Sequence, residues 1–227
     1  MARFSGANHK ELINHLRDTG SIKTDRIYDA MMAVERGDFT KSNPCTDAPQ
    51  SVGYSTTISA PHMHAHALEL LSDKLQEGSR ALDVGSGTGY LTVCMALMCG
   101  ESGKAVGIDH IQELVESSVK NVKKQHYDLL TSGRVILING EGRDGYAEEG
   151  PYDAIHVGAA PDVVPQALLD QLKPGGRLVL PVGPRGGKQV LQRHDKSPNG
   201  KLVKTELMNV IYGSLTSVDN QCPDLWK

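Results

Sequence analysis

The sequence lacks the features that would place the protein in a membrane or outside the cell. No run of apolar residues approaches the roughly 18 positions that a membrane-spanning helix needs. Residues 1–8 have no apolar core of the kind found in signal peptides. The four cysteines form no C-x-x-C pair and no regular framework, which favours reduced thiols. We therefore expect a cytoplasmic protein, located in the cytosol, with no membrane partner.

An excess of positive charge is also missing. The net charge of −3 at pH 7 provides no basic surface for phosphate contacts, so we expect no nucleic-acid partner. No internal repeat, low-complexity tract or linker divides the 227 residues, and we expect a single domain over 1–227. Its first part is predicted to contain helices over 8–18 and 24–34 and an extended loop over 40–57.

From residue 79 onward, short apolar runs alternate with helical patterns. This alternation predicts an α/β fold with a doubly wound, mainly parallel seven-stranded sheet and helices on both faces. We predict parallel strands over 80–84, 104–109, 134–139, 153–158 and 178–182, with helices after Pro61 and over 90–98, 111–125 and 163–172. Residues 173–177 (KPGGR) are predicted as a turn, and strands over 188–193 and 205–212 as a final hairpin across Asn199-Gly200.

Three glycines at alternate positions, Gly85, Gly87 and Gly89, follow the predicted strand that contains Asp83. Glycine suits a sharp turn, and it lets a ligand lie directly against the backbone. Asp109 closes the next predicted strand 24 residues after Gly85, where a carboxylate can bind ribose hydroxyls. A flexible linker is the alternative, but the apolar residues on both sides of the loop argue against it. The segment therefore predicts a site for a nucleoside-containing cofactor.

The spacing of the glycines distinguishes between two classes of cofactor. Dinucleotide-binding loops follow G-x-G-x-x-G or G-x-G-x-x-A, in which the third small residue lets helix and strand pack closely. Here the third glycine comes one position early, and Tyr90 stands in place of the small residue. The form G-x-G-x-G is associated with S-adenosylmethionine (AdoMet) and the class I methyltransferases, which have a Rossmann-like fold. An NAD-dependent oxidoreductase is the disfavoured alternative, because no acid–base constellation for hydride transfer accompanies the loop.

Three further segments carry a resemblance to a known family: 56–65 (TTISAPHMHA), 152–160 (YDAIHVGAA) and 172–178 (LKPGGRL). With the glycine loop, they make the chain similar to the protein-L-isoaspartate (D-aspartate) O-methyltransferase family from about residue 5 to residue 216. The first segment is the most specific, because other methyltransferases have no such element. The resemblance implies AdoMet-dependent methyl transfer to the free carboxyl of L-isoaspartyl and D-aspartyl residues in damaged proteins and peptides, which starts their repair.

The resemblance also assigns a catalytic position. We expect residues 1–60 to form an N-terminal helical cap over the open end of the sheet together with the substrate loop, and 61–227 to form the AdoMet-binding core. The family's serine that orients the substrate carboxylate corresponds to Ser59, directly before a predicted helix whose N-terminus can bind an anion. The alternative is that Ser59 only caps that helix. A carboxylate with an ordinary pKa of about 4 is ionised at neutral pH, so transfer needs positioning rather than a general base.

The histidines after Ser59 offer a metal as an alternative. Only His62 and His66 share a helix face, and no acidic residue completes a ligand set, so we predict no metal. The resemblance places His64 near the cofactor or Ser59. It also implies that Glu141 and its neighbour contact the adenine, although the family more often has Asp there.

Two features bear on the acceptor and on turnover. His156 ends the fourth predicted strand, where amino-methyltransferases carry a polar-Pro-Pro-aromatic motif, and the absence of that motif disfavours N-methylation. Gly213-Ser214 stands where the family usually has Val-Pro, beside the substrate cleft. This departure keeps open an AdoMet-binding recognition module with low or no turnover.

The expected partners are protein and peptide substrates that contain isoaspartyl residues, and we expect the chain to be a monomer. The cofactor is expected to be AdoMet. The predicted cofactor-binding residues are Thr56, Thr57, Ile58, Ser59, His64, Asp83, Val84, Gly85, Ser86, Gly87, Gly89, Asp109, His110, Glu141, Gly142, Thr216 and Gln221.

Overall fold

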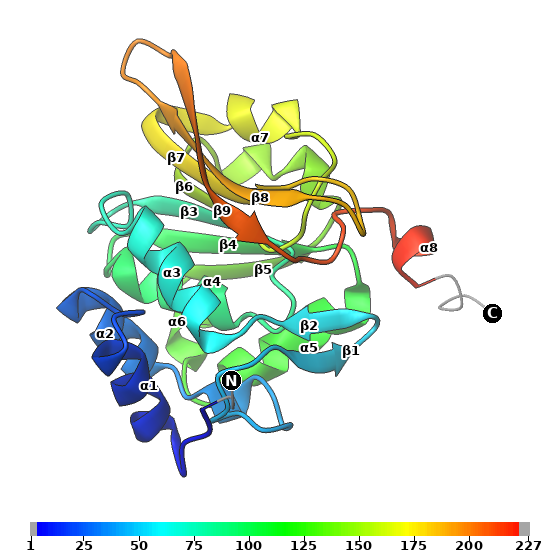
Figure 1. Ribbon diagram of the computed structural model, residues 1–227. Helices are drawn as coiled ribbons and strands as arrows, with labels where there is room; N and C mark the ends of the chain where they lie inside the picture. Colours follow the sequence, from blue (N-terminus) through cyan, green and yellow to red (C-terminus); the bar gives the residue numbers. More distant parts are fainter. Residues whose placement is uncertain (1–3, 223–227) are drawn as a thin grey trace.

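A seven-stranded sheet runs through the centre of the protein in a computed structural model that describes residues 4–222 (Figure 1). The strand order is β5-β4-β3-β6-β7-β8-β9. Neighbouring strands from β5 to β7 run parallel, whereas β8 and β9 are antiparallel. The strands are β3 (Arg80–Val84), β4 (Lys104–Asp109), β5 (Val135–Asn139), β6 (Tyr152–Val157), β7 (Leu172–Val182), β8 (Gln189–Lys196) and β9 (Leu202–Val210). The predicted α/β fold, doubly wound and mainly parallel, is confirmed.

The described part omits the ends of the chain. Residues 1–3 belong to the segment in which no signal peptide is predicted, and residues 223–227 to the predicted single domain; both stretches lie outside the described residues.

The central strands are buried because helices cover both faces of the sheet. Adjacent residues that point to opposite faces, Ala81 and Leu82 on β3 and Ala154 and Ile155 on β6, are each 0% exposed. A sheet covered on both faces requires such continuous apolar runs rather than alternation. One face packs against α3 (Pro61–Leu71), α4 (Tyr90–Met98), α5 (Gln112–Lys123) and α6 (Tyr127–Thr131), and the other against α7 (Gln166–Asp170) (Figure 1).

The two N-terminal helices pack against α3 and α4 (Figure 1). In α1 (His9–Asp18), the side chain of Asn8 caps the first turn by accepting a hydrogen bond from the Glu11 amide at 3.0 Å. The helix ends before Gly20, whose φ is +76°. α2 (Asp25–Ala33) follows and buries its apolar side against α4. Both predicted helices are confirmed.

A hairpin lies inside the segment predicted as an extended loop. Strands β1 (Gln50–Gly53) and β2 (Thr56–Ile58) pair antiparallel. The turn between them uses Tyr54 and Ser55 with φ of 51° and 54°, a left-handed conformation that residues other than glycine adopt rarely. The prediction of a loop over 40–57 was therefore wrong at the six strand residues that fall inside it.

The segment between β6 and β7 also differs from the prediction. α7 starts only at Gln166, because the residue before Pro165 is kept out of the helical region by the proline ring. β7 then begins at Leu172 and continues through the Lys-Pro-Gly-Gly-Arg sequence, with an irregular register opposite Tyr152 and Ala154. The predicted turn at 173–177 is therefore wrong, whereas the β8–β9 hairpin near Gly200 is confirmed.

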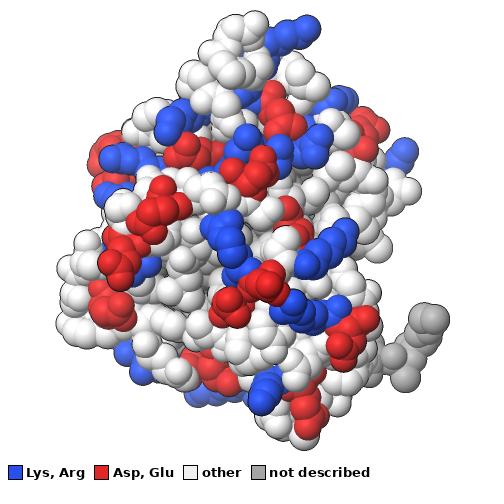
Figure 2. Space-filling view, turned by 90° about the vertical axis from the view of Figure 1, so that its left-hand side faces the viewer, with Lys and Arg blue, Asp and Glu red and all other residues white. Residues whose placement is uncertain are grey.

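Charged side chains are mixed on the surface. The face seen in Figure 2 carries acidic and basic residues side by side, without a broad area of one sign. Among the helices of residues 4–222, none has both the length and the apolar character needed to span a membrane.

Candidate functional site

A pocket of about 620 Å³ opens where β3 and β4 end. The hairpin and the start of α3 form one wall, and the segment after β9 forms another. The structure thus brings the glycine loop and the 56–65 segment to one cavity, although they are separate in the sequence. Nine of the predicted site residues line it: Thr56, Thr57, Ser59, Gly85, Asp109, His110, Gly142, Thr216 and Gln221.

The other predicted site residues lie behind this lining. They support the walls of the pocket from the loop, from the strand ends and from α3, and most of them are buried. They are Ile58, His64, Asp83, Val84, Ser86, Gly87, Gly89 and Glu141.

Asp109 ties the end of β4 to the glycine loop. Its Oδ2 accepts a hydrogen bond from the Gly87 amide at 3.0 Å, and its Oδ1 accepts one from the Ile111 amide at 3.0 Å. Burial raises the pKa of this carboxyl, and the two amide hydrogen bonds act against that shift. A carboxylate has about four acceptor sites, so two remain for a ligand in the pocket.

Asp83 has a different environment. Its Oδ1 lies 2.8 Å from Nδ1 of His156, and its Oδ2 accepts a hydrogen bond from the Thr92 hydroxyl at 2.7 Å. Asp83 and His156 are register partners on β3 and β6, and both are buried. This pair lies below the glycine loop and joins the loop to β6 and α4. It therefore supports the pocket from beneath.

Glu141 is held by a neighbouring arginine. Its carboxylate accepts hydrogen bonds from Arg143 Nε at 2.9 Å and Nη2 at 2.7 Å. The hydrogen bond with Arg143 lowers the pKa of Glu141. At this strand end the pocket is lined by the next residue, Gly142.

Ser59 lies at the corner between β2 and α3. The N-cap position of α3 is Ala60, and Pro61 occupies the first turn, where its missing N–H is not needed. The capping alternative for Ser59 is therefore wrong. Its side chain is half-buried and lines the pocket, and no hydrogen bond within residues 4–222 uses its hydroxyl. Its carbonyl accepts a hydrogen bond from Arg36 Nη2 at 2.8 Å.

The three histidines of α3 have separate roles. His62 lines the pocket, and its Nδ1 lies 2.8 Å from Asp47 Oδ1, which raises its pKa. His64 is buried and stacks on Tyr90, and burial lowers its pKa well below the ordinary value. Burial also lowers the pKa of His66. Within the described residues, no three His, Cys, Asp or Glu side chains are grouped to hold a metal ion.

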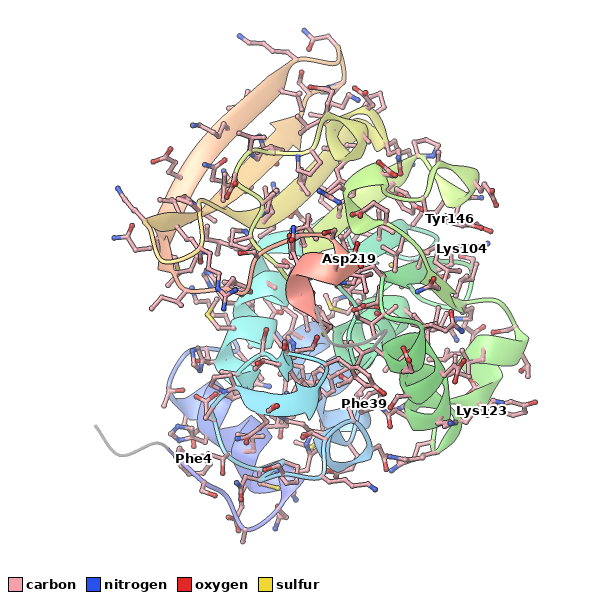
Figure 3. The ribbon with its side chains drawn as sticks, turned by 90° about the vertical axis from the view of Figure 1, so that its right-hand side faces the viewer. Phe4, Phe39, Lys104, Lys123, Tyr146 and Asp219 are labelled. Atoms are coloured by element: carbon pink, nitrogen blue, oxygen red, sulfur yellow. The ribbon has the colours of Figure 1, made fainter. Side chains whose placement is uncertain are left out.

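The C-terminal segment closes one side of the pocket. In α8 (Val218–Gln221), Gln221 Nε2 donates to the Thr56 hydroxyl at 2.9 Å, and its Oε1 lies 2.9 Å from His110 Nε2. Figure 3, in which Asp219 marks α8, shows this helix beside the hairpin. Upstream, the Ala160 amide donates to the Gly213 carbonyl at 2.7 Å, which anchors the segment that contains Gly213-Ser214.

Sequence reasoning missed several lining residues, among them Ser55, Arg185, Tyr212 and Asn220. None of them belongs to a motif. Ser55 lies in the hairpin turn, Arg185 in the loop between β7 and β8, and Tyr212 and Asn220 in the chain after β9. No local sequence signal marks these positions as part of a site.

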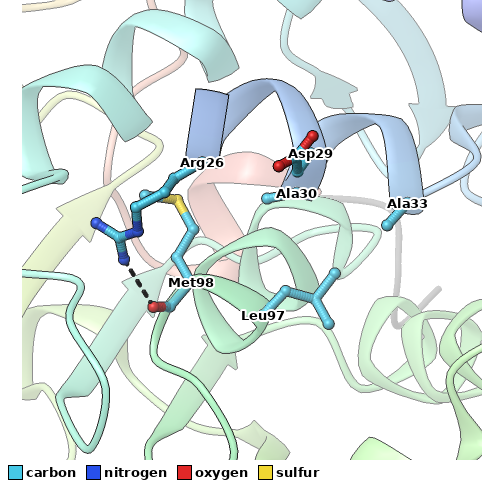
Figure 4. Close-up of a pocket in the computed structure, with 6 residues that line it drawn as sticks. All are labelled: Arg26, Asp29, Ala30, Ala33, Leu97 and Met98. Carbon is cyan, nitrogen blue, oxygen red and sulfur yellow. Dashed lines mark hydrogen bonds between the residues drawn. The ribbon is translucent and has the colours of Figure 1, made fainter. Parts of the chain in front are cut away.

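A second pocket of about 310 Å³ lies between α2 and α4 (Figure 4). Its basic residue Arg26, which lines it together with Asp29, donates to the carbonyls of Ser72, Leu75 and Met98, and the last of these bonds measures 3.0 Å. Because the guanidinium already binds three backbone oxygens, we interpret Arg26 as a residue that connects α2 to the ends of α3 and α4 rather than as a ligand-binding group.

Comparisons with known proteins agree with this geometry. Residues 7–220 match the family described as protein-L-isoaspartate(D-aspartate) O-methyltransferase. The protein-L-isoaspartate O-methyltransferase of Caenorhabditis elegans is 52% identical, over 96% of this chain and 97% of that protein. Protein-L-isoaspartate O-methyltransferase 1 of Arabidopsis thaliana is 49% identical, over 94% of this chain and 93% of that protein.

A solved structure shares the fold over nearly the whole chain. A putative protein-L-isoaspartate O-methyltransferase from Plasmodium falciparum, in complex with S-adenosyl-L-homocysteine, superposes with a TM-score of 0.86 at 37% identity. The match covers 93% of this chain and 99% of that one. On these grounds, the chain belongs to the protein-L-isoaspartate(D-aspartate) O-methyltransferase family.

Proposed function

We propose that this chain transfers a methyl group from AdoMet to the free carboxyl of L-isoaspartyl residues, and of D-aspartyl residues, in damaged proteins and peptides. The ester then collapses to a succinimide, which restarts the route to normal aspartate. One observation carries the proposal: Asp109 and the glycine loop share a single pocket with Ser59 and the start of α3. A donor site and an anion site are thus side by side.

The donor side has the groups that a nucleoside requires. Asp109 keeps two acceptor sites for ribose hydroxyls, and the left-handed glycines Gly85 and Gly87 let a ligand approach the backbone. Gly142 and His110 line the neighbouring strand ends, where an adenine would lie. Bound AdoMet would supply an electrophilic methyl group on its sulfonium. Thr56, Thr57, Thr216 and Gln221 line the same pocket, and the members of the cofactor set that do not line it support these contacts from behind.

The acceptor side has the groups that a carboxylate requires. Ser59 lines the pocket, and its hydroxyl has no hydrogen-bond partner within residues 4–222. His62 lies in the first turn of α3, and its raised pKa favours the cationic form beside an anion. We assign Ser59 to orienting the acceptor oxygen. An ionised carboxylate needs no general base, so holding its oxygen about 3–3.5 Å from the methyl carbon supplies much of the acceleration.

We further propose that the chain works in the cytosol as a monomer and forms a single domain. The first 60 residues contribute the hairpin and the rest the cofactor core. The free cysteines Cys45, Cys94, Cys99 and Cys222 support a reducing location.

The test is incubation with AdoMet and a synthetic isoaspartyl peptide, with the ordinary aspartyl peptide as the matched control. We expect base-labile methyl ester on the isoaspartyl peptide alone. Binding of AdoMet by calorimetry without any ester would contradict the proposal and select the recognition module, for which the departure at Gly213-Ser214 is the specific observation.

A further inference from the structure

Arg36 is a buried cation next to the acceptor site. It begins the short 3-10 helix η1 (Arg36–Asp38) and is only 1% exposed. Its Nη2 donates to the Ser59 carbonyl at 2.8 Å, and its guanidinium carbon lies 5.6 Å from the centre of the Tyr90 ring. It does not line the pocket, so any effect on the reaction passes through Ser59.

No carboxylate neutralises this charge directly. Among residues 4–222, no acidic side chain lies within ion-pair distance of Arg36. The carboxylate that most favours the charged form of Arg36 is Asp47, and it is already hydrogen-bonded to His62. His64 Nδ1 lies 3.5 Å from Nη1, and the Nε of Arg36 is buried without a partner.

An arrangement of this kind is costly in the free protein. An arginine keeps its charge inside a protein, and burial of an ion without a counter-ion is strongly unfavourable. A carbonyl, an imidazole and an aromatic face compensate the charge only in part. An anion bound at Ser59 would supply the missing negative charge.

We propose that Arg36 is a positioning residue that fixes the β2–α3 corner through the Ser59 carbonyl and provides the buried positive charge that the substrate carboxylate neutralises. This inference rests on the proposed function and adds a source of selectivity for charged acceptors. Arg36 makes the site prefer a carboxylate over a neutral amide of the same shape.

The test compares two ligands across three proteins. The ligands are an isoaspartyl peptide and the matching isoasparaginyl peptide, in which a neutral amide replaces the carboxylate. The proteins are the wild type, R36Q, which is neutral but keeps a donor for Ser59, and R36K, which keeps the charge. The readout is the ratio of the two peptide affinities, because general damage to the site cancels in the ratio.

We expect R36Q to lower the preference for the charged peptide about tenfold, and R36K to stay within about threefold of the wild type. Added salt should weaken isoaspartyl peptide binding more in the wild type than in R36Q. Affinity for S-adenosylhomocysteine should change by less than about twofold, since the charge acts on the acceptor side. R26Q is the control, because Arg26 also holds carbonyls but far from the pocket.

An unchanged ratio in R36Q would overturn the inference, as would equal losses for both peptides in R36Q and R36K. These outcomes leave the proposed function intact if the wild type still forms ester. A wild type that forms no ester on the isoaspartyl peptide would overturn the proposed function, and this inference with it.

Discussion

Asp47 Oδ1 lies 2.8 Å from Nδ1 of His62 and also accepts a hydrogen bond from the His62 amide at 3.0 Å. One carboxylate therefore fixes both the backbone and the ring of a residue that lines the pocket. The hydrogen bond raises the pKa of His62. Burial acts to raise the pKa of Asp47, but the bonds from His62 outweigh it and lower that pKa overall. The two segments, 36–47 and the start of α3, are thereby joined beside Ser59.

This pair should give a measurable pH dependence of stability. A raised pKa of His62 in the folded state means that its contribution is complete below about pH 6.5, its ordinary value, and is lost as pH rises through the raised pKa. The contribution of Asp47 is lost as pH falls through its lowered pKa. The gap in unfolding free energy between wild type and H62Q should therefore shrink from pH 5.5 to pH 8.5.

The gap should stay below about 1 kcal/mol, because the His62 side chain is 44% exposed and solvent screens the pair. Urea unfolding at the two pH values measures it. The other histidines titrate in both proteins and cancel in the difference. A gap that stays constant or grows with pH would show that the ion pair is not formed in solution.

Ser59→Ala should separate turnover from cofactor binding. Loss of the hydroxyl should lower kcat/KM for an isoaspartyl peptide by about tenfold to a hundredfold, because the acceptor oxygen is less well oriented. Affinity for S-adenosylhomocysteine should remain within about twofold, and the unfolding free energy within about 0.5 kcal/mol, since Ser59 does not cap α3. Methyl-ester formation and calorimetry provide the two readouts. Equal losses in turnover and in cofactor affinity would argue against the assigned role.

Asp109→Asn should act on the cofactor instead. The substitution removes the charge from the hydrogen bonds to a ribose, and each such bond accounts for about 1.5–3 kcal/mol, so AdoMet affinity should fall at least tenfold. Because the pKa of Asp109 is raised, wild-type affinity should also decrease as pH is lowered through that pKa, while the affinity of D109N should not. Calorimetry at several pH values tests both. Asp128→Asn on α6 is the control, and an equal loss there would refute the assignment.

The parts of the site that follow from local rules could be predicted from the sequence. Gly85 and Gly87 belong to a strand–turn–helix unit and Asp109 ends the strand that follows it, and the parallel topology brings these two strand ends to one edge of the sheet. The hairpin could not be predicted in this way. Its turn uses Tyr54 and Ser55, which lack the Asn-Gly or Asp-Gly signal of tight hairpins, and its strands are held by Ile58 and Val52, which pack in and against the main core.

The residues beneath the site are a second class that local patterns do not reveal. Asp83 meets His156 only because β3 and β6 are adjacent at that register, although 73 positions separate the two residues in the sequence. Arg36 lies in a polar stretch and is of a residue type that is usually exposed, yet the fold buries it. Such contacts depend on tertiary packing, which overrides residue type.

Gly213 lines the pocket and should tolerate a side chain. A Cβ placed there meets no atom within 4 Å, and its φ lies outside the left-handed range. The segment around Gly213 is held to Ala160 by backbone hydrogen bonds, one of them from the Leu215 amide to the Ala160 carbonyl at 2.8 Å. Because these bonds use backbone atoms only, an added methyl group breaks none of them. Gly213→Ala should therefore raise the unfolding free energy by about 0.4–1 kcal/mol, because it restricts the unfolded chain.

Gly89→Ala is the matched control: its φ is +84° and its Cβ would lie 3.2 Å from Ser118 Cβ, so we expect it to lower stability. Urea unfolding of both variants decides the matter, and a destabilised G213A would mean that this segment needs the glycine backbone.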